Sequence, residues 1–228
     1  MIIKTFEVGP IAACCYIVVD ERTKDAMVID PGGDGDFLVG EIKALEARPL
    51  FLVNTHGHAD HMAANAEIKQ AFPEIQICIH AGDAEMLASA ENNLSSFLGA
   101  QITSPAADRF LAEGDAITLG KNTFKVIHTP GHTRGGICLY CEKPDGKTPG
   151  VIFTGDTLFQ MGLGRTDFPD SEFSEQQKFK MLVDGIRDKI LTLPEKTLVY
   201  PGHGPATTVG NEKRRNPFLS GSGTLWLP

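Results

Sequence analysis

Residues 54–65, NTHGHADHMAAN, place three histidines and one aspartate within six positions: His56, His58, Asp60 and His61. Imidazole and carboxylate groups are poor core material, but they are the ligands of zinc, iron and manganese in working sites. His56 and His58 are two residues apart, so in an extended segment both side chains point the same way and can bind one ion. Asp60 and His61 begin the next predicted helix, which favours a second ion beside the first.

Three further metal-type side chains follow the ends of predicted strands. The apolar runs TFKVIHTPG, GVIFTG and TLVYPG are followed by His132, Asp156 and His203, just as PLFLVN precedes His56. Ligands bind at the carboxyl ends of strands in α/β proteins, so we expect these segments to meet. Seven candidate ligands exceed what one tetrahedral ion needs. They favour two divalent ions about 3.5 to 4 Å apart, zinc first or else iron or manganese, with Asp156 as the bridging carboxylate.

Strands and helices alternate along the chain in an order that can position these residues. Apolar and alternating runs predict strands at 1–8, 14–20, 25–30, 49–54, 75–80, 116–120, 123–129, 136–141, 150–155 and 196–202. Helical spacing predicts helices at 36–48, 59–72, 81–92 and 171–191, and residues 92–115 read as an irregular excursion. This order predicts an α/β (α+β) domain with two sheets and outer helices over residues 1–228, ending in a Gly/Ser-rich tail from about 217.

Composition limits the class of protein. The chain has 228 residues, an apolar fraction of 42% and a net charge of −8, which disfavours nucleic acid as a partner. No run of 18 apolar residues and no signal peptide is visible, so we expect no membrane span. Five cysteines without disulfide spacing favour a cytoplasmic protein. Cys138 and Cys141 form a CxxC within a predicted strand, where they would point to opposite faces and serve packing.

At the candidate ligands the chain resembles the metallo-β-lactamase superfamily. THGHADH matches the HxHxDH motif of that family, and the three later residues match its later ligand positions. The resemblance spans nearly the whole chain and implies an αββα four-layer sandwich. It also implies that His56, His58 and His132 bind a first ion, that Asp60, His61 and His203 bind a second, and that Asp156 is shared.

Finer motifs are similar to glyoxalase II, the hydroxyacylglutathione hydrolases, in their short bacterial form: TPGHTRGGICLY, FTGDTLFQMGLGRTDFP and YPGHGPATT. That resemblance implies hydrolysis of a thioester such as S-lactoylglutathione by a metal-bound hydroxide, which Asp60 would help to orient as a catalytic residue. The glutathione-binding features of the long form are not reproduced, since Arg165-Thr166-Asp167 and Pro205 stand at those positions. Arg165 could bind a substrate carboxylate, or could form an ion pair with Asp167 or Asp170.

Other functions stay open at this point. A persulfide dioxygenase would share HxHxDH and the segment GRTDF, and would hold one iron by His56, His132 and Asp156; PGHGP around His203 argues against it. Lactonase or β-lactamase activity would use the same chemistry, and a metal-binding role without catalysis is the plainest alternative. The oligomeric state is open.

Three other residues are left outside the predicted site. For Asp30 in VIDPGG we favour turn chemistry over hydrogen bonding to a ligand histidine. His80 ends a predicted strand and is interpreted as a hydrogen-bonded structural histidine. His128 lies inside a predicted strand, and the turn at Pro130-Gly131 separates it from His132, so it is also left out of the site.

Overall fold

Two six-stranded sheets lie face to face in the computed structural model, which describes residues 1–146, 149–169 and 172–220. The first sheet has the order β1 (Ile2–Val8), β2 (Ala13–Val19), β3 (Asp25–Ile29), β4 (Arg48–Val53), β5 (Gln76–His80), β6 (Arg109–Leu111). The second has the order β14 (Thr207–Thr208), β13 (Leu198–Pro201), β10 (Val151–Gly155), β9 (Ile137–Cys141), β8 (Asn122–His128), β7 (Ala116–Leu119). A small hairpin, β11 (Leu158–Phe159) and β12 (Gly162–Leu163), stands apart. Residues 221–228 of the predicted tail lie outside the described residues.

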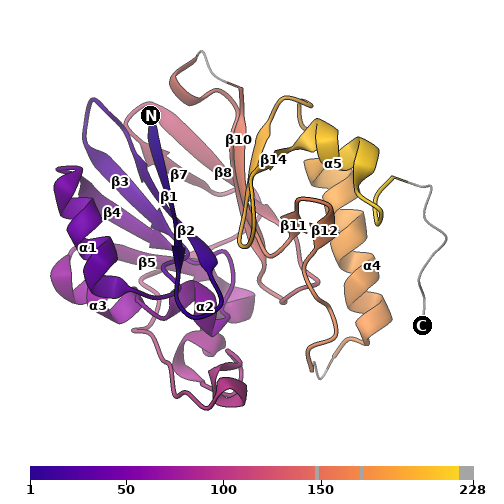
Figure 1. Cartoon of the computed structure of the whole chain (residues 1–228), viewed down its shortest axis with the longest axis horizontal. Helices are drawn as coiled ribbons and strands as arrows, with labels where there is room; N and C mark the ends of the chain where they lie inside the picture. The colour runs from indigo at the N-terminus through magenta and orange to yellow at the C-terminus, as the bar shows by residue number, and fades with distance from the viewer. Residues whose placement is uncertain (147–148, 170–171, 221–228) are drawn as a thin grey trace.

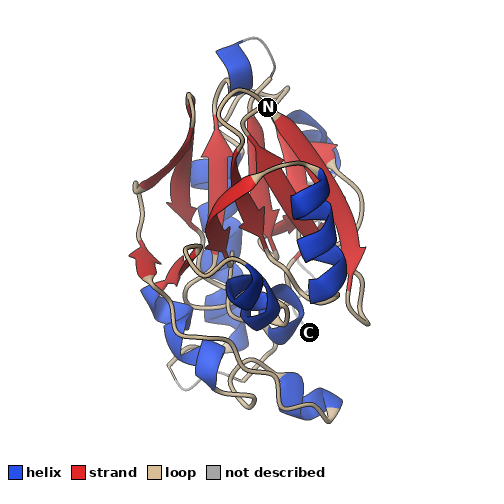
Figure 2. Cartoon of the chain, turned by 90° about the vertical axis from the view of Figure 1, so that its left-hand side faces the viewer, coloured by secondary structure: helices blue, strands red, loops and turns tan. Residues whose placement is uncertain are grey.

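Helices cover the outer face of each sheet (Figures 1 and 2). Beside the first sheet lie α1 (Gly35–Ala44), α2 (Ala59–Met62) and α3 (Asn65–Ala71), followed by the 3₁₀ helices η1 (Ala81–Ala88) and η2 (Ser95–Leu98). Beside the second lie α4 (Glu175–Gly185), its π-helical continuation η4 (Ile186–Ile190) and α5 (Val209–Arg215); η3 (Pro144–Gly146) is a single turn. The predicted αββα sandwich is therefore confirmed.

Three apolar layers hold the sandwich together. The layer between the sheets includes Met27, Phe124 and Phe153, all fully buried. A second layer joins the first sheet to its helices, and a third joins the second sheet to α4 and α5. Cys138 belongs to the third layer and Cys141 to the layer between the sheets, so the two thiols point to opposite faces as predicted. All five cysteines are buried.

The strands that precede the candidate ligands share one direction within each sheet. In the second sheet β9 is antiparallel to both β8 and β10, and β13 is parallel to β10, so β8, β10 and β13 all run the same way. In the first sheet β4 lies parallel to β3 and β5. A backbone hydrogen bond from Ile137 to the carbonyl of Thr55 joins the end of β4 to the second sheet. The ends of these four strands therefore meet, as their sequence pattern indicates.

The helix predicted over 59–72 is wrong in its continuity, because the chain breaks it into α2 and α3. The N–H of Ala64 donates to the carbonyl of Pro31 at 2.9 Å instead of to Asp60. The carbonyl of His61 accepts from the Asn54 side chain at 2.8 Å. Gly32 packs so tightly that a Cβ there would lie 1.5 Å from the carbonyl oxygen of Asp60. Partners from distant parts of the chain thus replace the helical hydrogen bonds.

Two other predicted elements differ in detail. The helix predicted at 81–92 is the 3₁₀ helix η1, and the excursion at 92–115 contains η2 and β6. Leu94, which precedes η2, has a left-handed backbone with φ of 68°. Among the described residues, none of the helices is both long and apolar enough to cross a membrane.

Candidate metal centre

All seven candidate ligands gather where the strand ends meet. Three groups of side chains bring one nitrogen or oxygen atom each to within 4.8 Å of one another: His56, His58, His132; His56, His61, Asp156; Asp60, His61, His203. The loop after β4 and helix α2 supply four of these side chains, while β8, β10 and β13 lead to the other three. Each of the three groups therefore combines side chains from both halves of the sandwich.

The spacing of the ligand atoms fits metal coordination. His58 Nδ1 and His132 Nε2 are 3.0 Å apart. Two ligand atoms of a tetrahedral zinc site, each about 2.0 to 2.1 Å from the ion, are separated by roughly 3.3 Å. Asp156 Oδ1 lies 3.4 Å from His61 Nε2, and its Oδ2 lies 3.5 Å from His132 Nε2 and 3.7 Å from His203 Nε2. Asp156 thus faces histidines of both predicted ligand sets, so it could be shared between two ions.

Several of these atoms are buried without a hydrogen bond to any described residue. They are His56 Nε2, His61 Nε2 and Asp156 Oδ1. Buried polar groups are almost always satisfied, because an unmet hydrogen bond costs about 1 to 3 kcal/mol. Three such atoms pointing into one cluster of nitrogen and oxygen donors are what a bound divalent cation would explain, so the residues present fit the metal.

Hydrogen bonds on the far side of two rings fix their tautomers. His132 Nδ1 donates to the carbonyl of Arg165 at 2.8 Å, because a carbonyl can only accept. Its Nε2 therefore presents a lone pair to the cluster. Thr55 Oγ1 donates to Asp30 Oδ2 at 2.6 Å and lies 3.2 Å from His56 Nδ1, which in turn donates to it. His56 Nε2 is then left free for a metal.

Asp30 is more than a turn residue, and the favoured interpretation from sequence was wrong. Its φ of 51° is indeed a turn conformation. However, its buried carboxylate accepts the N–H and hydroxyl of Thr55 at 2.7 and 2.6 Å. Oδ2 also lies 3.1 Å from His61 Nδ1. Asp30 therefore orients two candidate ligands from behind.

The electrostatics of the cluster favour bound cations. Burial lowers the pKa of His56 and of His58 well below the usual value, and the neighbouring histidines add to the effect. Burial alone would also lower the pKa of His61, but three carboxylates led by Asp156 outweigh it and raise that pKa well above its usual range. Burial opposes ionisation of Asp60, yet His61 and a hydrogen bond from His203 hold its pKa far below normal. Divalent cations would neutralise these carboxylates without a proton on a ligand nitrogen.

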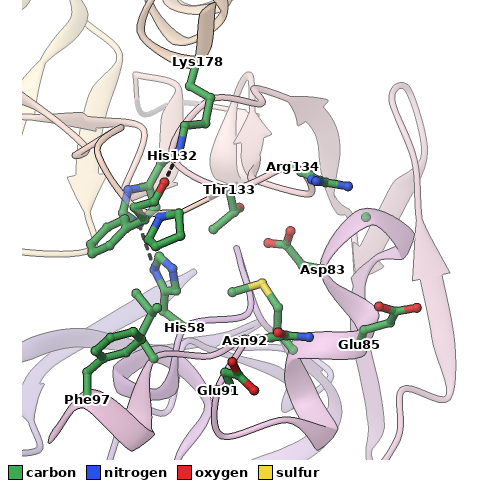
Figure 3. Close-up of a pocket in the computed structure, with 15 residues that line it drawn as sticks. His58, Asp83, Glu85, Glu91, Asn92, Phe97, His132, Thr133, Arg134 and Lys178 are labelled. Atoms are coloured by element: carbon green, nitrogen blue, oxygen red, sulfur yellow. Dashed lines mark hydrogen bonds between the residues drawn. The ribbon is translucent and has the colours of Figure 1, made fainter. Parts of the chain in front are cut away.

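A cavity of about 640 Å³ opens from the cluster at His58 and His132 (Figure 3). Apolar side chains line part of it: Met86, Leu94, Phe97 and Phe168. Of its cationic groups, Arg134 pairs with Glu172 at 2.7 Å and Lys178 donates to the carbonyl of Phe168. A substrate held here would place its reacting carbon beside the candidate ligands.

A sequence profile described as the metallo-beta-lactamase superfamily matches residues 8–203. The chain belongs to this superfamily. A probable metallo-hydrolase from Bacillus subtilis, YqgX, is 37% identical over 94% of this chain and 95% of its own. The hydroxyacylglutathione hydrolase GloC from Haemophilus influenzae is 36% identical over 94% of this chain and 97% of its own.

Solved structures of the superfamily show the same fold. The B3 metallo-beta-lactamase BLEG-1 is 35% identical with a TM-score of 0.84, over 96% of this chain and all of its own. The protein TTHA1623 in a di-iron-bound form is 32% identical with a TM-score of 0.79, over 95% of this chain and 100% of its own. ETHE1 from Myxococcus xanthus is 26% identical with a TM-score of 0.77, over 100% of this chain and 92% of its own. This superfamily member is thus an enzyme of the metallo-hydrolase class with a cluster suited to divalent metals.

Arg165 lies at the rim of the centre. Its guanidinium makes two hydrogen bonds to Asp167, at 2.9 and 2.7 Å, and stands 4.7 Å from the ring centroid of Phe168. The side chain is 69% exposed, so it can exchange this partner for another at small cost. Asp170, the other partner considered, lies outside the described residues.

Two further predictions concern residues outside the cluster, and one residue was missed. His80 accepts the N–H of Gly82, and His128 Nε2 donates to the carbonyl of Arg134, in keeping with structural roles.

Asp83 in AGDAEML is buried against the ligand loops. Its sequence context is an ordinary acidic first turn, which gives no sign of that position.

Proposed function

We propose that this chain hydrolyses a thioester, such as S-lactoylglutathione, to a hydroxy acid and a free thiol. Two divalent ions, zinc first, would be held by His56, His58 and His132, by Asp60, His61 and His203, and by Asp156 between them. One observation carries this proposal: the three ligand groups lie side by side, because His56 and His61 each belong to two of them. They also contain buried atoms that have no hydrogen-bond partner among the described residues: His56 Nε2, His61 Nε2 and Asp156 Oδ1. The name of the GloC relative supports the thioester as substrate.

The side chains around the centre have distinct roles in this proposal. When bound, the ions would supply Lewis acidity that brings the pKa of water down to about 7 and would stabilise charge on the attacked carbonyl. Asp60 Oδ2 lies 3.1 Å from His203 Nε2 and 3.3 Å from His61 Nε2, which is the spacing of ligand atoms around one ion, and Asp60 would also orient the attacking water. Arg165 fixes the His132 ring through its carbonyl.

The acyl and thiol parts of the substrate would bind in the cavity. Its apolar side chains suit the acyl chain, while Arg134 and Lys178 already have protein partners. Arg165 would bind a substrate carboxylate by exchanging it for Asp167. The chain would act in the cytoplasm, in keeping with its five cysteines that lack disulfide spacing.

A second candidate is a persulfide dioxygenase with one iron at His56, His132 and Asp156. The likeness to ETHE1 and the segment GRTDF favour it. The third ligand group, Asp60, His61 and His203, argues for the hydrolase. A site with one iron at His56, His132 and Asp156 would not use this group to bind metal. Lactones and β-lactams are further substrates of the same chemistry, and the likeness to BLEG-1 makes them worth testing.

Metal analysis of the purified chain, paired with a substrate panel, tests the proposal. We expect two equivalents of metal and hydrolysis of S-lactoylglutathione at rates above those for lactones and β-lactams. We also expect loss of at least about 100-fold in kcat/KM in His56→Ala. One equivalent of iron with oxygen uptake on glutathione persulfide would favour the dioxygenase instead.

Arg165 is tested by comparing charged and uncharged substrates. Arg165→Gln should raise KM for the glutathione thioester, and leave KM for an uncharged thioester unchanged. The matched control is Arg214→Gln, whose guanidinium pairs with Glu195 on the surface. A wild-type KM for the glutathione thioester in Arg165→Gln would restrict the role of Arg165 to its ion pair with Asp167.

A further inference from the structure

Asp83 is a buried carboxylate outside the candidate ligand set. It stands in the first turn of η1, is only 1% exposed, and borders the cavity (Figure 3). Burial raises the pKa of Asp83, while hydrogen bonds from neighbouring groups, including the N–H of Gly135 and Gly57, act in the opposite direction. A carboxylate removed from water persists only where such donors compensate for the lost hydration.

The two oxygens of Asp83 bind two different loops. Oδ2 accepts the N–H of Gly57 at 3.1 Å, and Oδ1 accepts the N–H of Gly135 at 2.6 Å. Gly57 stands between His56 and His58, while Gly135 follows His132 by three residues. One carboxylate therefore joins the loop after β4 to the loop after β8.

These loops belong to different sheets, so strand pairing does not set their separation. One backbone hydrogen bond, from Ile137 to Thr55, crosses between them at 2.9 Å. Asp83 adds two more bonds nearer to the ligands. Charge-assisted hydrogen bonds of this kind are about twice as strong as neutral ones.

The contact is packed so closely that only glycines fit. A Cβ on Gly135 would lie 2.7 Å from Asp83 Cγ, and a Cβ on Gly57 would lie 2.6 Å from Met86 Cβ. The backbone amides can therefore approach the carboxylate from both sides. The group of ligands that spans the same two loops is His56, His58 and His132, in which His58 Nδ1 and His132 Nε2 are 3.0 Å apart.

We propose that Asp83 is a positioning residue that sets the separation of these two loops and so determines the metal affinity of the His56, His58 and His132 group. The inference rests on the proposed function, because it needs that group to bind metal. Asp83 itself is not in any of the three candidate ligand groups, and both of its oxygens accept backbone N–H groups. Removing it should weaken one ion and spare the other, since Asp60, His61 and His203 do not depend on the Gly135 loop.

The test measures zinc affinities of the two sites by competition with a chromophoric chelator. Asp83→Asn should weaken one zinc about 10- to 100-fold, the usual effect of losing a group that orients ligands, and leave the other unchanged. The absorption spectrum of the cobalt-substituted protein should shift as well. The matched control is Asp20→Asn: Asp20 is 2% exposed and accepts N–H groups of Arg22 and Thr23 at a turn remote from the cluster. It should reduce stability without changing either affinity.

A second variant separates position from charge. Asp83→Glu keeps the negative charge but moves the carboxylate by one methylene, so its zinc affinity should fall too. Wild-type affinity in Asp83→Glu, or unchanged affinities and cobalt spectrum in Asp83→Asn, would overturn the positioning role while the proposed function stands. Failure of the wild-type chain to bind two ions would overturn the proposed function, and this inference with it.

One measurement needs no variant. Amide hydrogen exchange of the wild-type chain should show the N–H groups of Gly57 and Gly135 protected both with and without metal, because Asp83 binds them directly. Rapid exchange of both amides in the zinc-loaded protein would contradict the proposal.

Discussion

At the scale of single residues, the ring of His56 depends on one hydroxyl group. Thr55 donates to Asp30 and accepts from His56 Nδ1. The buried Asp30 carboxylate therefore orients the hydroxyl of Thr55, and that hydroxyl orients the ring of His56. Thr55→Val keeps the shape but removes this link. We expect zinc affinity to fall about 10- to 100-fold, measured by competition with a chelator.

Thr118→Val is the control for this change, because Thr118 is exposed on β7 and its hydroxyl lies 3.4 Å from that of Thr123. Its zinc affinity should equal that of the wild type. If Thr55→Val also bound zinc as tightly as the wild type, the hydroxyl would have no part in orienting His56.

The convergence of the seven candidate ligands could be predicted from sequence, whereas the residues behind them could not. His132, Asp156 and His203 each follow an apolar run, and that local pattern carries their position. Asp83 bonds to residues 26 and 52 positions away, and both partners are backbone amides that any residue type supplies. No local pattern records such a contact. Asp30 was misjudged for a related reason, because its turn conformation and its ligand contacts occur together.

At the scale of elements, strands were predicted more securely than helices near the site. A strand's alternation reflects burial in its own sheet, as in β8, where Phe124 and Val126 point inward. The break between α2 and α3 arises from Pro31 and Asn54, which lie in the loops after β3 and β4 and take over helical hydrogen bonds. The spacing of apolar residues within 59–72 therefore predicts one continuous helix and cannot predict the break.

A histidine pair joins the ends of β5 and β8, one from each sheet. The rings of His80 and His128 are stacked, with centroids 4.1 Å apart and an angle of 9° between planes. Burial lowers the pKa of His80, and the neighbouring His128 adds to the effect. Glu113 and Lys189 also meet His128, but they pair with each other at 2.8 Å and so offset one another.

This depressed pKa gives the stability a pH dependence of known sign. As pH falls through the usual histidine pKa of about 6.5, the unfolded chain takes up a proton at residue 80 that the folded chain resists. The contribution of His80 to the free energy of unfolding should therefore fall from pH 7.5 to pH 5.5. His80→Gln should lose less stability than the wild type over this pH range, measured by urea denaturation of the metal-free protein. Equal falls in wild type and variant would show that the stack does not resist protonation.

At the scale of the whole molecule, the metal centre joins the two halves of the sandwich. The first half supplies His56, His58, Asp60 and His61, and the second supplies His132, Asp156 and His203. The apolar layer between the sheets already holds the halves together, so a bound metal would add to a formed core rather than create one. Seven buried or half-buried polar side chains facing one another without cations would weaken that junction.

Removal of metal should therefore lower the melting temperature without abolishing the fold. Zinc at about 1,000 times its dissociation constant stabilises the native state by about 4.1 kcal/mol per site. For a chain of this length about 1 kcal/mol corresponds to 2 to 4 °C, so chelation should lower the melting temperature by roughly 8 to 16 °C or more. Calorimetry of the chelated and reloaded protein measures the shift, and far-UV circular dichroism checks that secondary structure remains. The shift should shrink in His203→Ala and persist in Arg214→Gln, since only His203 faces the cluster. A melting temperature indifferent to chelation and reloading would mean that the cluster does not hold metal in the folded protein.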